Sequence, residues 1–162
     1  MEKYITIVGT PSSGKTTYLQ KCINNCPSSE NMRVALCFNS NIGKQYFGIL
    51  CYPSLNGVFW PWIDGAIVMV EKTRGDFLDQ VKVHINEIEK QRNIPIVVCG
   101  SKFDLVDEIT NKHIDMLLSE ILNDIPYFDI SSPDEYNIEK PFLAFAKHFN
   151  NNTTVSFLEH KL

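Results

Sequence analysis

The chain has 162 residues, of which 44% are hydrophobic and 21% charged, and this balance is ordinary for a globular fold. Its formal net charge of −4 argues against broad binding to nucleic acid or to an anionic membrane, because both need a basic surface. A chain of this length most simply forms one domain, here residues 1–162.

Short β-branched runs alternate along the chain with longer segments of helical periodicity. Gly43 indicates a turn between the second and third of these runs, and therefore a hairpin. Strands that alternate with helices imply a mostly parallel sheet covered on both faces. We therefore expect an α/β fold with about six strands, one antiparallel edge strand and helices on both faces. The predicted strands are 4–8, 33–38, 46–52, 65–71, 94–100 and 126–131, and the predicted helices are 14–23, 75–92, 110–123 and 138–149.

Signals for secretion or membrane attachment are not recognisable in the sequence. No apolar run reaches the roughly 18–20 residues of a membrane-spanning helix. The N-terminal MEKYITIVGT becomes polar too soon for a signal peptide, and the C-terminal FLEHKL lacks a prenylation cysteine. These features predict a cytoplasmic or nuclear protein that does not bind membranes, and we expect a monomer.

The five cysteines form an odd-numbered set without the spacing of a disulfide framework. Cys22 and Cys26 lie four residues apart near a predicted helix, which is compatible with a metal-binding pair. No CxxC motif or nearby histidine pair completes such a site. We therefore expect buried, reduced thiols in a reducing compartment.

The first predicted strand leads into GTPSSGKT at residues 9–16, an unbroken match to G-x-x-x-x-G-K-[ST]. In this motif the backbone N–H groups point at phosphate oxygens, and the following helix adds the positive end of its dipole. An ordinary Gly/Ser-rich turn is the simpler alternative, but the strand–loop–helix context favours phosphate binding. Lys15 would contact the β- and γ-phosphates, and the Thr16 hydroxyl would bind Mg²⁺. The predicted phosphate-binding residues are Gly9, Pro11, Ser12, Ser13, Gly14, Lys15, Thr16 and Thr17.

The strand at 94–100 is followed by Ser101-Lys102-Phe103-Asp104. Here the chain resembles the Ras-like small GTPases, whose guanine motif is Asn-Lys-x-Asp. The resemblance implies that the Asp104 carboxylate accepts hydrogen bonds from the guanine N–H groups, while the Lys102 stem covers the ring. Ser101 replaces the asparagine of the family and removes its side-chain contacts. A solvated loop is the simpler alternative at this place.

Within that superfamily, two segments are similar to the Ran family of nuclear-transport GTPases: IPIVVCGSKFDL and PYFDISSPDEYNIEKPFLAFAKHF. The resemblance covers roughly residues 3–158 and is strongest at 5–19 and 94–149. It implies the fold of a P-loop NTPase of the small-GTPase kind, with GTP or GDP and weakly held Mg²⁺ as cofactors.

The second guanine loop of that family, Ser-Ala-Lys, becomes Ser131-Ser132-Pro133 in this chain. Backbone N–H groups near Ser131 and Ser132 could still bind the guanine O6, but the lysine stem is lost. The resemblance also implies transport receptors and regulators as partners. The sequence ends at Leu162 without the acidic tail of the family, and the predicted helix 110–123 lacks its basic cluster, which argues against those contacts.

The segment between the two motifs lacks the hydrolytic residues that the resemblance implies. The family has Asp-x-x-Gly followed by glutamine, and aligned on Gly57 these positions hold Ser54 and Val58. A serine is a weaker candidate for Mg²⁺, and a valine has neither donor nor acceptor to orient a water. Only Ser28 or Ser29 could replace the threonine of the first switch, and both are more simply loop residues. We therefore expect no catalytic residue and absent or very slow hydrolysis.

Phe59, Trp60 and Trp62 follow this segment, either as core residues or as an exposed patch that binds a partner. If nucleotide binding has been lost, the chain would be a nucleotide-free pseudo-GTPase that competes for Ran-type partners. A P-loop kinase or ATPase would also fit the phosphate loop, but the second acidic or arginine-rich catalytic set that it needs is not found in the sequence.

Overall fold

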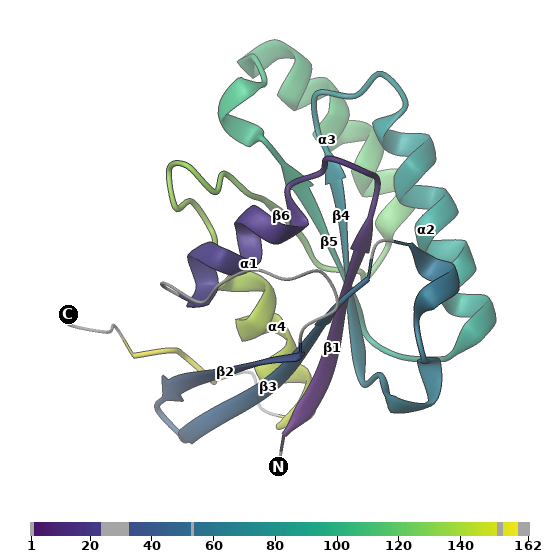
Figure 1. Cartoon of the computed structure of the whole chain (residues 1–162). Helices are drawn as coiled ribbons and strands as arrows, with labels where there is room; N and C mark the ends of the chain where they lie inside the picture. The colour runs from purple at the N-terminus through teal and green to yellow at the C-terminus, as the bar shows by residue number, and fades with distance from the viewer. Residues whose placement is uncertain (1, 24–32, 53, 152–153, 159–162) are drawn as a thin grey trace.

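The computed structural model describes residues 2–23, 33–52, 54–151 and 154–158, and within these ranges it contains one six-stranded sheet (Figure 1). The strands lie in the order β2-β3-β1-β4-β5-β6. They are β1 (Lys3–Gly9), β2 (Arg33–Ser40), β3 (Gly43–Cys51), β4 (Gly65–Glu71), β5 (Ile96–Ser101) and β6 (Tyr127–Asp129). The four α-helices are α1 (Lys15–Ile23), α2 (Phe77–Gln91), α3 (Glu108–Leu122) and α4 (Lys140–Phe149).

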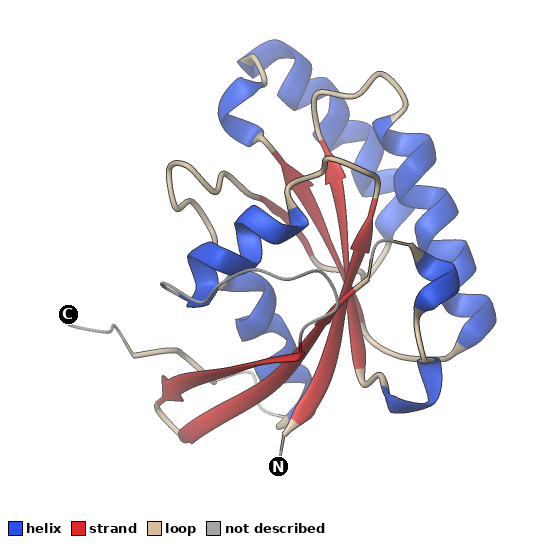
Figure 2. Cartoon of the chain, viewed as in Figure 1, coloured by secondary structure: helices blue, strands red, loops and turns tan. Residues whose placement is uncertain are grey.

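Neighbouring strands pair in parallel except for β2 and β3, which form an antiparallel hairpin at one edge (Figure 2). The predicted α/β class, the number of strands and the antiparallel edge are therefore confirmed. The hairpin turns at residues 41–42, and Gly43, with a φ of 112°, opens β3 three residues earlier than predicted. Strand β6 is shorter than the predicted 126–131: the Ile130 N–H still donates to the carbonyl oxygen of Gly100 over 2.8 Å, but Ser131 pairs with Tyr136 in an isolated bridge.

Each face of the sheet carries its own hydrophobic core. Along β4, Ile67 and Met69 point to the side of α1 and α4, whereas Ala66, Val68 and Val70 point to the side of α2 and α3. This alternation follows from the two-residue period of a strand, and it explains why the central strands are apolar throughout.

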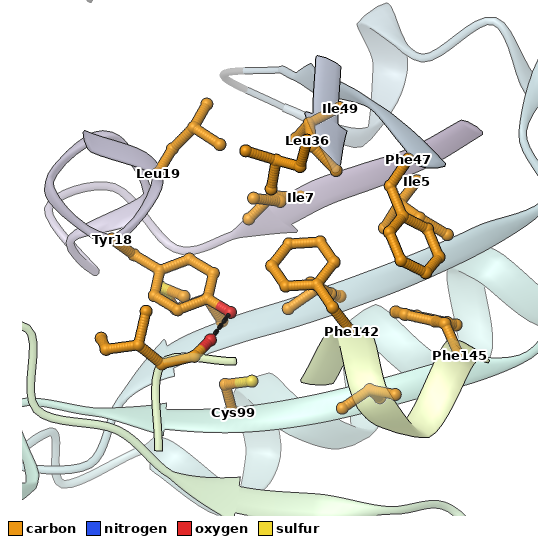
Figure 3. Close-up of a cluster of buried hydrophobic side chains, with 14 of the residues drawn as sticks. Ile5, Ile7, Tyr18, Leu19, Leu36, Phe47, Ile49, Cys99, Phe142 and Phe145 are labelled. Atoms are coloured by element: carbon orange, nitrogen blue, oxygen red, sulfur yellow. Dashed lines mark hydrogen bonds between the residues drawn. The ribbon is translucent and has the colours of Figure 1, made fainter. Parts of the chain in front are cut away.

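The core on the α1 and α4 side is rich in aromatic rings. Figure 3 shows the Tyr18 ring lying between α1 and the sheet, with its hydroxyl pointing toward the chain next to α4. That hydroxyl donates to the carbonyl oxygen of Ile138 over 2.7 Å, so the one polar atom of this buried ring is satisfied. The Phe142 ring stacks on Tyr18 at 6.3 Å and thereby anchors α4 to α1.

The parallel strands bring the functional motifs to one edge of the sheet. β1, β4 and β5 are mutually parallel, so Gly9, Glu71 and Ser101 all end strands at the same edge. Ligands of open α/β sheets bind at this edge. Within the residues described, no helix is both long and apolar enough to cross a membrane.

Candidate nucleotide-binding site

The loop between β1 and α1 has a backbone conformation that requires glycine at two of its positions, Gly9 and Gly14. A Cβ atom at Gly9 would collide with the carbonyl oxygen of Met69 on the neighbouring strand, so only glycine fits there. Gly14 has a φ of 88°, in the region that favours glycine, while Ser12 has a φ of 61°. Ser13 donates its backbone N–H to the carbonyl oxygen of Thr10 over 3.3 Å. The loop is therefore wound tightly against the sheet before α1 begins.

Lys15, the first residue of α1, folds its side chain back over this loop. Its ammonium group donates to the carbonyl oxygen of Thr10 over 2.8 Å, and to Gly9 O and Ser13 Oγ over 3.4 Å each. Thr16 and Thr17, on the first turn of the helix, are exposed. A cation and the positive end of a helix thus face the same space.

A pocket of about 580 Å³ lies against this loop. Among the described residues its walls are Pro11, Ser12, Ser13, Gly14, Lys15, Thr16, Thr17 and Lys102. Lys102 is distant from the others in the sequence, so the structure brings one residue of the predicted base motif to the predicted phosphate loop. The predicted residues Gly9, Ser54, Ser101, Asp104, Ser131 and Ser132 are not among its walls.

The loop after β5 presents the predicted base-binding side chains in different ways. The backbone of Lys102 lies in the left-handed region, with a φ of 57°. Its ammonium group forms an ion pair with Glu71 Oε1 at 3.2 Å. The Asp104 carboxylate is exposed at the end of the loop. Ser101 is buried, and its hydroxyl has no hydrogen-bond partner within the described part of the chain; the same holds for the buried hydroxyl of Thr10.

The loop after β6 is joined directly to the Asp104 loop. Ser131, which is buried, donates its hydroxyl to Asp104 Oδ1 over 3.0 Å. Its backbone N–H points to the carbonyl oxygen of Tyr136 over 3.4 Å, so this amide is engaged within the loop. The Phe103 and Tyr136 rings stack at 5.5 Å with an angle of 20°. Ser132 is half-buried beside these residues.

Two residues at the end of β4 take part in this region although the sequence assigned them no role. Glu71 accepts from the Thr73 hydroxyl over 2.7 Å and pairs with Lys102. The Thr73 hydrogen bond, and then the Lys102 ammonium, hold the pKa of Glu71 below its usual value. Lys72 is fully buried and pairs with Asp115 and Asp129. A charged residue next to an apolar run carries no sequence signal for such burial.

The segment between the motifs is held in two short 3₁₀ turns, Leu55–Gly57 and Trp60–Trp62. Ser54 is exposed, and the Gly57 N–H donates to its carbonyl oxygen over 3.3 Å. The Val58 side chain is only 8% exposed and packs into the core on the α2 and α3 side. The position that the sequence prediction aligns with the glutamine of the family therefore faces the protein interior.

The neighbouring aromatic residues divide between core and surface, so each of the two alternatives is correct for part of the set. Trp60 packs against the core on the α2 and α3 side. Phe59 and Trp62 are 50% and 67% exposed, and their rings meet edge to face at 4.9 Å. Arg92 donates to the carbonyl oxygens of Trp60 and Pro61 over 2.9 and 2.7 Å, which fixes this turn against the end of α2.

The cysteines do not form a metal site in the described ranges, which hold no cluster of three or more potential side-chain ligands. Burial raises the pKa of the Cys22 thiol to about 12, which disfavours the thiolate that a metal requires. Cys26, the other member of the pair, lies outside the described residues, as do Ser28 and Ser29. Cys99 is buried and Cys22 is half-buried, but Cys37 is exposed, so the prediction of buried thiols was wrong for Cys37: its side chain leaves the outer edge strand away from the core.

A sequence model of the Ras family matches residues 48–151, more than half of the chain. The chain therefore belongs to the Ras family of GTP-binding small GTPases, and its six-stranded mixed sheet with four helices agrees with the fold of that family. The matched range contains the loops after β5 and β6, and the phosphate loop lies outside it.

Proposed function

We propose that this chain is a divergent, Ran-like protein that binds GDP or GTP as a single-domain monomer and hydrolyses GTP very slowly or not at all. The observation that carries the proposal is the contrast between the phosphate loop and the segment at 54–58. The loop keeps every residue type that phosphate binding needs. The segment has serine at the position aligned with the aspartate of the family and valine at the position aligned with its glutamine, and the Val58 side chain is buried.

The phosphate side of the proposal rests on the loop geometry. Phosphate oxygens would take the hydrogen bonds that the Lys15 ammonium now makes to Thr10 O and Gly9 O. The exposed Thr16 hydroxyl would hold Mg²⁺ together with the phosphates, since Mg²⁺ is ordinarily bound through few protein ligands. Buried hydroxyls without partners are uncommon, and those of Thr10 and Ser101 at this edge of the sheet support a polar ligand there.

The base side rests on the bond between Ser131 and Asp104. It engages Oδ1 of the carboxylate and so would orient the group toward the N1–H and 2-amino donors of a bound guanine. Lys102 lines the phosphate pocket and would cover the base with its stem. Because the Ser131 N–H already points to Tyr136 O, Ser132 is the better candidate for the guanine O6.

Nucleotide binding is tested by titrating the purified, nucleotide-stripped protein with fluorescent GDP, GTP and ADP, with and without Mg²⁺. We expect saturable binding at micromolar concentration or below, a preference for guanine, and loss of binding in Lys15→Ala. Lys90→Ala is the matched control, because Lys90 is an exposed lysine in the last turn of α2. Tighter binding of ADP than of GDP would overturn the proposal.

Slow hydrolysis is tested separately, by single-turnover measurement of [γ-³²P]GTP with protein in excess. We expect a rate close to that of free GTP, because catalysis of phosphoryl transfer depends on positioning and electrostatics that Ser54 and Val58 do not supply. Turnover well above the free rate that Lys15→Ala abolishes would contradict this part of the proposal and leave nucleotide binding intact.

A second candidate function is that of a pseudo-GTPase that binds partners without nucleotide. The exposed Phe59 and Trp62 pair favours it, because aromatic side chains anchor interfaces. Transport receptors or regulators of the Ran type are the partners that this reading implies, in the cytoplasm or nucleus. This function predicts no saturable nucleotide binding in the titration above. It also predicts that the protein captures such a receptor in a pull-down, and that the substitution Trp62→Ala abolishes this capture.

A further inference from the structure

Lys72 is buried to a degree that is unusual for a lysine. It directly follows β4, its side chain is 0% exposed, and its Nζ lies 2.7 Å from both Asp115 Oδ1 and Asp129 Oδ1. Lysine is almost never fully buried unless it is paired. Two short charge-assisted bonds satisfy this requirement and fix the position of the ammonium group.

The groups around Lys72 come from α3, from β6 and from the segment after β5, which contributes Phe103. Asp115 belongs to α3, Asp129 ends β6, and the Tyr127 hydroxyl also donates to Asp129 Oδ1 over 2.7 Å. Burial, and then the charge of Asp129, raises the pKa of Tyr127, so this hydroxyl remains a donor. The ammonium lies 5.3 Å from the centroid of the Tyr127 ring and 5.8 Å from that of Phe103.

The same residues adjoin both loops of the candidate base site. The Lys72 N–H donates to the carbonyl oxygen of Ser101 over 3.0 Å, at the start of the Asp104 loop. Asp129 is followed by Ile130, whose carbonyl oxygen accepts from the Phe103 N–H over 3.1 Å. Phe103, under which the ammonium lies, directly precedes Asp104. Lys72 is thus in contact with both chain segments that the bond between Ser131 and Asp104 joins.

We propose that Lys72 is a positioning residue for base recognition: through Asp129 and the Phe103 ring it holds the Asp104 loop and the Ser131 loop at the spacing at which the Asp104 carboxylate reads guanine. This inference rests on the proposed function and adds to it a residue that would not touch the nucleotide. The sequence pattern of the guanine motif does not include it.

The charges around Lys72 explain why replacing this one residue should shift the positions of the Asp104 and Ser131 loops. Without the ammonium, the Asp129 carboxylate, which is 17% exposed, loses its counter-charge, whereas the Asp115 carboxylate is 46% exposed and water can solvate it. An unpaired buried charge is strongly destabilising. Asp129 would therefore move toward water, and Ile130, Ser131 and the bonds to the Asp104 loop would move with it.

The test compares GDP with inosine diphosphate, which lacks the 2-amino group that the Asp104 carboxylate would accept from. In wild-type protein we expect GDP to bind more tightly than inosine diphosphate, and in Lys72→Met we expect the ratio of the two affinities to fall at least fivefold. The double variant Lys72→Met/Asp129→Asn removes the uncompensated charge without restoring the bonds. It should regain thermal stability but keep the reduced ratio, and it replaces Lys72→Met if that variant does not fold.

The matched control is Ile88→Ala, which removes a buried side chain from α2 and lowers stability without contacting either loop. It should leave the ratio unchanged. Faster amide hydrogen exchange at Phe103 and Ile130 in Lys72→Met than in Ile88→Ala would support the inference. A full GDP preference in both Lys72 variants would overturn this inference alone, whereas wild-type protein that binds neither nucleotide would overturn the proposed function as well.

Discussion

The Ser131 hydroxyl donates to Asp104 Oδ1 over 3.0 Å and so joins two loops that follow neighbouring strands, β6 and β5. Ser131 is buried, whereas Asp104 is exposed. The bond therefore fixes the orientation of a solvent-facing carboxylate through a hydroxyl that lies in the protein interior. In the proposed function, this bond would pre-organise the carboxylate for the guanine donors.

Removal of the Ser131 hydroxyl should therefore weaken GDP binding without unfolding the protein. A hydrogen bond to a charged group contributes about 1.5–3 kcal/mol, so we expect Ser131→Ala to bind GDP roughly 10- to 100-fold more weakly. Ser119→Ala, which removes an exposed hydroxyl from α3, is the control and should bind like wild type. Calorimetric titration measures both, and an unchanged affinity in Ser131→Ala would show that the bond does not orient Asp104.

Substitution of Asp104 itself should alter which base is preferred. Asp104→Asn replaces one acceptor oxygen with a donor NH₂ group, so the guanine 2-amino group loses its partner, while xanthine, with a carbonyl at that position, gains one. We expect at least tenfold weaker GDP binding and measurable binding of xanthosine diphosphate. Asp134→Asn, on the next loop, is the control. If Asp104→Asn retained its GDP affinity, the base would be read by another residue.

The sequence predicted the parts of the fold and site that depend on local pattern. The apolar runs at 65–71 and 94–100 became the central strands β4 and β5 because strands buried on both faces are apolar throughout. Residues 9–16 could be predicted as a tight loop between β1 and α1, because the backbone geometry at Gly9 and Gly14 requires glycine; their binding of phosphate stays a prediction.

Other features depend on contacts between distant segments, which no local pattern encodes. The burial of Lys72 results from two carboxylates 43 and 57 residues away. Likewise, the sequence left Phe59, Trp60 and Trp62 as one undivided set, and only the position of the 3₁₀ turn over the core decides that Trp60 packs inward. The Glu71–Lys102 ion pair was missed for the same reason.

Restoring the glutamine of the family at position 58 should not restore hydrolysis. Val58 is buried among apolar side chains, so Val58→Gln would place an amide there at a cost of about 1–3 kcal/mol. We expect a lower melting temperature and an unchanged single-turnover rate. Val58→Ala separates lost packing from buried polarity, since it lowers stability without adding an amide. A rate increase in Val58→Gln with an intact fold would contradict the inward orientation of this position.

The thiols should differ in reactivity according to their burial. At pH 8, iodoacetamide should modify the exposed Cys37 in the native protein and leave Cys22 and Cys99 unmodified, as peptide mass mapping would show. Burial raises the pKa of Cys22 from about 9 to about 12. Above pH 9 the Cys22 thiol ionises in the unfolded protein but stays protonated in the folded one. The free energy of unfolding should therefore be unaffected by this thiol below pH 9 and should fall as the pH rises toward 12. A Cys22→Ala variant should therefore show a shallower fall in unfolding free energy across this range.

The two tryptophans of the chain offer a direct test of the turn at Trp60–Trp62. Trp62 is 67% exposed, whereas Trp60 packs against the core on the α2 and α3 side. Trp62→Phe should remove the fluorescence that acrylamide quenches most efficiently and should change stability by less than about 0.5 kcal/mol. Trp60→Phe should retain that quenching and lower the melting temperature, because it leaves a gap in the core. Equal quenching of the two single-tryptophan variants would mean that the turn does not hold Trp60 inward, and the exposed pair formed by Phe59 and Trp62 would then lose its structural basis.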